Sequence, residues 1–144
     1  MLLLLLMMLK NSGMTLKNNI HSCTISAYGD WRMSDESQII DLGDIEHLLT
    51  KKRLKMINHD RIGWKGMHFP REEFFKTLDR KRYDDCDIVY PCILVENAAN
   101  PYNKKYRMID GKHRIAKMRQ MGIHRSLFYV LQPAKIERYL KPKL

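Results

Sequence analysis

The regular spacing of apolar residues is clearest between positions 106 and 122. Along residues 106–109, Tyr106 and Met108 alternate with Arg107 and Ile109, which is the period of a strand with one buried face. After Gly111, apolar residues recur every third position along 112–121, as on the buried side of a helix. Gly111 and Gly122 allow the backbone conformations that often begin and end such a helix. This segment therefore predicts a short strand, a tight turn and a helix.

Apolar runs and turn signals predict further elements on both sides of this segment. They are a strand turning into a short helical turn at 38–49, a loop at 56–68 with an exposed Trp64, a helix at 69–83, strands at 88–96 and 125–131, and a short helix from Pro133. The run at 88–96 is apolar almost throughout, which predicts a strand buried on both faces. Pro91 should restrict its hydrogen-bonded part to the residues that follow. A weaker strand is expected at 21–28.

These elements predict an α+β fold with a small mixed sheet flanked by helices. The strands at 88–96 and 106–109 should form an antiparallel hairpin. The strand at 106–109, the helix and the strand at 125–131 should form a strand-helix-strand unit with a right-handed crossover. We expect one domain at 37–132, preceded by a leader and extension at 1–36 and followed by a short helix and basic tail at 133–144.

The first nine residues are apolar but too few to cross a membrane. As a helix they would span about 14 Å, against roughly 30 Å of hydrocarbon. No membrane span is therefore expected. Three widely spaced cysteines, an odd number, argue against a disulfide framework and favour a reducing, cytoplasmic location: Cys23, Cys86 and Cys92.

The excess of positive over negative charge lies entirely in the last third of the chain. The whole sequence has 26 Lys and Arg against 16 Asp and Glu, a net charge of +10. Residues 101–144 contain 12 Lys and Arg against two acidic residues, Asp110 and Glu137, which already accounts for +10. This distribution favours a polyanionic partner, a nucleotide or a nucleic acid such as DNA or RNA. A basic surface that serves only solubility is the alternative.

Cations gather at the start of the predicted helix at 112–121. The first turn of a helix leaves several backbone N–H groups without intrahelical partners, and the helix dipole adds partial positive charge there. Lys112, His113 and Arg114 bring basic side chains to that same end. They oppose the dipole and would be poor choices for stability alone, but they suit a bound anion. We interpret this junction as a phosphate-binding site.

The same residues resemble a known family. The sequence Gly111-Lys112-His113-Arg114, after a strand and at the start of a helix, resembles the signature of the ParB/sulfiredoxin-like fold, where Gly-Glu-Arg-Arg, Gly-Cys-His-Arg or Asp-Gly-x-His-Arg occurs. The strand Tyr-Pro-Cys-Ile-Leu-Val at 90–95 is similar to the family's Pro-Ile-x-Val strand. The resemblance covers 37–132.

That resemblance implies a site for ATP or CTP at the helix N-terminus. Gly111 would let the backbone approach a phosphate, and His113 and Arg114 would donate to phosphate oxygens. Lys112 stands where sulfiredoxin has its cysteine nucleophile and partition proteins have a glutamate, so neither chemistry is expected by that route. Asp110 is the candidate general base or Mg²⁺ ligand. Its alternative role is that of a turn residue or N-cap.

Three functions therefore remain open. The first is a nucleotide-binding domain that transfers or hydrolyses phosphate. The second is a nucleic-acid-binding or nuclease-like module that uses residues 101–144 and the aromatic side chains among them. The third is an inactive regulatory module. As a test of the site, Arg114→Ala is expected to leave the stability of the unliganded protein within about 1 kcal/mol, as for a surface residue.

Overall fold

The structure is a computed structural model that describes residues 30–32, 37–64, 67, 76, 78–100 and 102–142. The predicted strand at 21–28, the apolar segment at 1–9, Cys23 and most of the predicted helix at 69–83 lie outside these residues. The strands are β1 (Asp30–Arg32), β2 (Gln38–Asp41), β3 (Leu54–Asn58), β4 (Ile62–Gly63), β5 (Cys92–Glu96), β6 (Tyr106–Asp110), β7 (Arg125–Leu131) and β8 (Leu140–Pro142). The α-helices are α4 (Arg80–Asp85), α5 (Lys112–Gln120) and α6 (Pro133–Ile136). The 3₁₀ helices are η1 (Leu42–Leu48), η2 (Lys51–Arg53), η3 (His59–Arg61) and η4 (Glu137–Tyr139).

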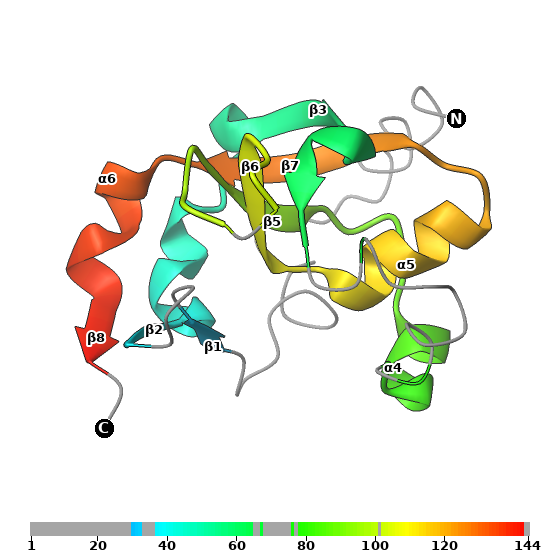
Figure 1. The fold of residues 1–144 in the computed structure, drawn as a ribbon, viewed down its shortest axis with the longest axis horizontal. Coiled ribbons are helices and arrows are strands. Elements are labelled where there is room, and N and C mark those ends of the chain that lie inside the picture. Colours follow the sequence, from blue (N-terminus) through cyan, green and yellow to red (C-terminus); the bar gives the residue numbers. More distant parts are fainter. Residues whose placement is uncertain are drawn as a thin grey trace.

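The strands form a mixed five-stranded sheet and a smaller three-stranded one. The order of the large sheet is β3-β7-β5-β6-β4, so β5 lies at its centre (Figure 1). Strand β5 runs antiparallel to β6 and parallel to β7. The small sheet pairs β2 with β1 on one side and with β8 on the other, both antiparallel. The predicted α+β class with a mixed sheet and the predicted β5–β6 hairpin are confirmed.

The predicted strand-helix-strand unit is wrong in its pairing. Strand β5 lies between β6 and β7, and its two pairings show that β6 and β7 run in opposite directions. A right-handed crossover joins parallel strands, so β6, α5 and β7 do not form one. The apolar pattern locates each strand but does not choose its neighbour. The apolar run in β5 requires cover on both faces, which the elements packed against the two faces of the sheet supply.

Each face of the large sheet has its own hydrophobic core. Alternate side chains of β5 divide between them, with Ile93 and Val95 on one face and Cys92 and Leu94 on the other. The first face packs against β2, η1 and α6, through residues that include Ile40, Leu42, Ile45 and Ile136. The second packs against α5, through Ile115, Ala116 and Met118. Helices α6 and α5 accordingly lie at opposite ends of the view in Figure 1.

Two strands lie where the sequence predicts other structure. Strand β3 includes Lys55 from a basic run and extends into the segment predicted to be a loop, and β4 lies wholly within that segment. Both occupy edges of the large sheet, where polar and charged residues are common, so the apolar signal is weak. Trp64, expected to be exposed, is only 4% exposed and belongs to the core beside α5.

The predicted core strands are confirmed. Four of the five residues of β5 are fully buried, and Pro91 precedes the first hydrogen-bonded residue as expected. Phe128 and Tyr129 of β7 are buried in the two cores rather than exposed. The short helix from Pro133 also forms, and Ile136 packs into the same core as β2. None of the described helices has the length and apolar character needed to cross a bilayer.

One buried polar pair lies at the edge of the sheet. His59 Nε2 and Ser126 Oγ are 2.8 Å apart, and both side chains are buried. Burial, with Arg119 and His124 nearby, lowers the pKa of His59 to about 4. The imidazole is therefore neutral at neutral pH and joins η3 to β7.

Candidate functional site

The junction between β6 and α5 is built on Gly111. Its φ of 124° is a backbone conformation that L-amino acids with a side chain rarely adopt. A Cβ atom at this position would lie 2.4 Å from both Cβ and Sγ of Cys92, the first residue of β5. The glycine therefore allows the helix to begin against the central strand. The close packing against Cys92 by itself requires a glycine at this position. The predicted approach of a phosphate would be a second reason for it.

Arg114 lies inside the protein rather than at its surface. Its side chain is 2% exposed, and Nη2 lies 3.1 Å from Oδ2 of Asp110, whose side chain is 14% exposed. Burial raises the pKa of Asp110 to about 6, although the guanidinium of Arg114 opposes this shift. The two groups form a buried ion pair that joins the end of β6 to the first turn of α5. The structure thus brings two predicted site residues together, but their charged groups bind each other.

His113 is held by the segment before α4. The backbone N–H of Asp79 donates to Nε2 of His113 at 3.1 Å. Burial is the largest cause that lowers the pKa of His113 to about 4, followed by Arg82 and Lys112. The imidazole is therefore neutral at pH 7, with its proton on Nδ1 while Nε2 accepts. His113 does not add a positive charge to the site.

Two cations remain beside the first turn of α5. Lys112 is half-buried at the first helical position, and Arg82 is exposed on α4. Arg82 lies close enough to affect both neighbours, because its charge lowers the pKa of Asp110 and of His113. The first turn of α5 contains no acidic side chain, and Gly111 supplies no side-chain cap. The charges of Lys112 and Arg82 therefore both act near a helix end that has no acidic side chain in its first turn.

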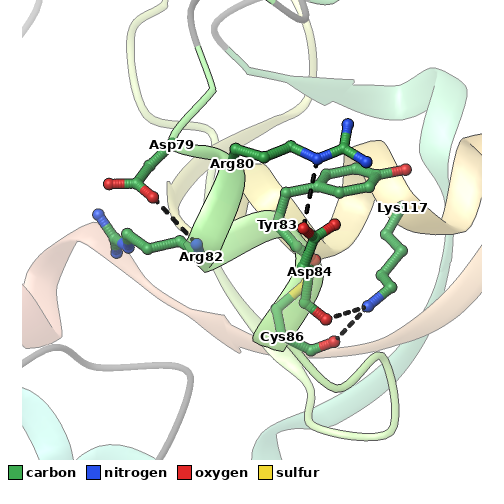
Figure 2. A network of polar contacts seen from close by, with 7 residues as sticks. All are labelled: Asp79, Arg80, Arg82, Tyr83, Asp84, Cys86 and Lys117. Atoms are coloured by element: carbon green, nitrogen blue, oxygen red, sulfur yellow. Dashed lines mark hydrogen bonds and ion pairs between the residues drawn. The ribbon is translucent and has the colours of Figure 1, made fainter.

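Helix α4 lies alongside α5 and carries Arg82, which Figure 2 shows beside Asp79 at the start of α4. Oδ1 of Asp79 accepts a hydrogen bond from the backbone N–H of Arg82 at 3.0 Å, which caps the helix. At the other end, Nζ of Lys117 donates to the carbonyl oxygens of Asp84 at 3.0 Å and Cys86 at 2.9 Å.

This start for α4 corrects the predicted helix at 69–83. Residues 80–82 were expected at the end of that helix, but they form the first turn of α4. Sequence reasoning missed Arg82 for this reason. The available signal was Asp79, a favourable N-cap residue directly before the basic triplet.

The residues do not fit a dedicated metal site. Among the described residues no three His, Cys, Asp or Glu side chains converge on one point. Asp110, the predicted Mg²⁺ ligand, is engaged by Arg114. Asp84 and Asp85 end α4 and Asp87 follows it; all three are exposed, and Asp87 Oδ1 accepts from the N–H of Val89 at 3.0 Å, as in an Asx turn.

The predicted nucleic-acid residues do not gather on one surface. Tyr106, Phe128 and Tyr129 are buried, so their rings do not lie open for stacking against bases. Several cations have local partners: Lys105 Nζ lies 3.5 Å from Glu96 Oε1, and Lys141 Nζ lies 3.2 Å from Asp44 Oδ2. Other cations lie on α5 and α6, at opposite ends of Figure 1. The positive charge of the last third is therefore divided over the fold.

Comparison with known proteins gives no relative: the chain matches no family model, no curated protein and no solved structure. The likeness to the ParB/sulfiredoxin-like fold therefore depends on the motif at 111–114 and on the order of the elements around it. The chemistry of the junction has to be argued from its own geometry.

Proposed function

We propose that the first turn of α5 binds the phosphate groups of a nucleotide such as ATP or CTP. The observation that carries the proposal is the helix end at Gly111, which has no acidic residue in its first turn and has Lys112 and Arg82 close enough to lower the pKa of His113. Backbone N–H groups of a first helical turn bind phosphate well, because they lack intrahelical partners and share the positive end of the dipole. Lys112 and Arg82 would contact the phosphate oxygens.

The resemblance at 111–114 supports a nucleotide over other anions. Transfer or hydrolysis of phosphate extends the proposal, since positioning and charge neutralisation supply most of that catalysis. Asp110 is the nearest carboxyl group, but its pairing with Arg114 makes it a poor base and a poor Mg²⁺ ligand. Cys86 and Cys92 are buried thiols, which is compatible with action in the cytoplasm.

A thermal-shift panel with ATP, ADP and CTP, each with and without Mg²⁺, tests the proposal. A nucleotide present at a hundred times its Kd should add roughly 2.7 kcal/mol to the free energy of unfolding. If no nucleotide shifts the transition, the proposal is wrong, and an inactive module becomes the better interpretation. Binding to a DNA or RNA duplex that weakens steeply with salt, without any nucleotide shift, would favour the nucleic-acid function.

Two cation variants locate the site. Lys112→Met and Arg82→Met should each raise the Kd of the nucleotide about tenfold, because each loses a charged hydrogen bond worth about 1.5 kcal/mol. Isothermal titration calorimetry gives both values. Lys81→Met is the matched control, since Lys81 is an exposed cation adjacent to Arg82 on α4. If Lys81→Met weakens binding as much, the ligand responds to net charge and not to this site.

A further inference from the structure

We propose that α4 is a lid over the first turn of α5, held shut by neutral His113 and released when that histidine takes up a proton. The lid would control access to the site described above, and that part rests on the proposed function. The latch itself is a property of the protein without ligand.

Polar contacts at its two ends attach α4 to α5. At the amino end, the backbone N–H of Asp79 donates to His113 Nε2. At the carboxyl end, Lys117 binds two carbonyl oxygens, as Figure 2 shows. No residue of α4 is fully buried, and Tyr83 packs only partly against the core beside α5. An element held in this way can be released without unfolding the sheet.

The two attachments respond differently to pH. The bonds from Lys117 to the carbonyl oxygens do not involve the His113 ring, so they persist when that ring takes up a proton. His113 can accept from Asp79 only while Nε2 carries no proton. A protonated ring would present an N–H group to the N–H of Asp79, and the contact would become repulsive. The amino end of α4 is therefore the end that opens in acid.

The charges around His113 oppose protonation while the lid is closed. Burial, Arg82 from α4, and Lys112 and Arg114 from α5 all lower its pKa, and only the carboxylate of Asp79 raises it. Release of α4 removes the burial and Arg82, so the pKa moves from about 4 back toward 6.5. Because the closed state binds the proton more weakly, the latch has its full strength above pH 6.5 and loses it as the pH falls toward 4.

Hydrogen exchange of the whole chain without nucleotide tests the latch. Exchange rates are divided by the intrinsic rate at each pH, which yields the opening equilibrium. Between pH 7 and pH 5 the opening of residues 79–86 should increase by up to about 20-fold, as expected for a pKa that moves between 4 and 6.5. Amides of β5 and β7 exchange through larger openings that also expose His59, so their pH dependence is compared between variants and not with that of residues 79–86.

Two variants separate the latch from general instability. His113→Gln places a neutral acceptor near the position of Nε2, so opening should lose its pH dependence between pH 5 and 7. Lys117→Met should increase opening at both pH values and keep the wild-type pH dependence. His59, with a pKa of about 4, and Asp110, with a pKa of about 6, also titrate in acid, but both are present in every variant, so the difference between the wild type and His113→Gln reports His113.

The proposal is overturned if opening at residues 79–86 shows the same pH dependence in His113→Gln as in the wild type, or if His113→Gln changes the pH dependence of β5 and β7 as much as that of residues 79–86. A pH-dependent latch in a protein that binds no nucleotide would leave the latch standing and remove only its link to the proposed function. Nucleotide binding without pH-dependent opening of α4 would remove the latch and leave the proposed function standing.

Discussion

Replacing Arg114 with alanine is expected to lower the free energy of unfolding by about 3 to 5 kcal/mol, the usual cost of removing one partner from a buried ion pair. The side chain is 2% exposed and pairs with Asp110. Its loss leaves the Asp110 carboxylate in a poorly hydrated place without a counter-charge. Denaturation in urea, followed by circular dichroism, measures the change. This replaces the expectation from sequence that Arg114→Ala leaves stability almost unchanged.

Arg80→Ala is the matched control for this prediction. Arg80 pairs with Asp84 at the same sequence spacing and a similar distance, 3.3 Å, but the two side chains are 79% and 54% exposed. An exposed pair of this kind contributes about 0.3 to 0.5 kcal/mol. Burial is therefore the main difference between the two pairs. If the two variants lose equal stability, the Asp110–Arg114 pair does not hold the junction together.

Replacing Gly111 with alanine is expected to cost about 3 kcal/mol or more, for two reasons that add. An alanine would be held at a φ of 124°, which costs about 1 to 3 kcal/mol for a residue with a Cβ atom. Its Cβ would also meet Cys92 at 2.4 Å, and overpacking of a core usually costs about 1 to 3 kcal/mol. Urea denaturation again supplies the measurement.

Gly122→Ala isolates the first of these two causes. Gly122 has a φ of 77°, but a Cβ atom there would meet nothing within 4 Å. Its replacement should cost only the conformational strain, about 1 kcal/mol. Cys92→Ala should not rescue Gly111→Ala, because the Cβ of Cys92 lies as close as its Sγ. Equal losses at the two glycines would show that α5 does not pack tightly against β5.

The elements with strong apolar patterns could be predicted from the sequence, whereas their pairing could not. The run at 88–96 and the segment from Tyr106 to Gly122 gave β5, β6 and α5 nearly in their observed places. Nothing in those patterns shows that β5 separates β6 from β7, because strand order depends on contacts between distant residues. Strand β3 was missed because Lys55 and Asn58 belong to an edge strand with a polar side.

The start of α5 at Gly111 could be predicted from the sequence, whereas the contacts of the basic side chains around it could not. Gly111 begins α5, and basic residues do surround it. The sequence could not tell which of them face solvent, since burial depends on the elements that fold over them. Arg114 turns back to Asp110, and His113 is occupied by Asp79. Arg82 joins the site only because α4 packs beside α5, and no local pattern reveals that contact.

The proposed binding of phosphate at the first turn of α5 is tested most directly by a nuclear magnetic resonance titration of the ¹⁵N-labelled chain with ATP. We predict saturable shifts that are largest at the backbone amides of Lys112, His113 and Arg114, and that weaken in Lys112→Met. Shifts centred on another part of the fold, or spread over the basic residues without saturation, would contradict the account.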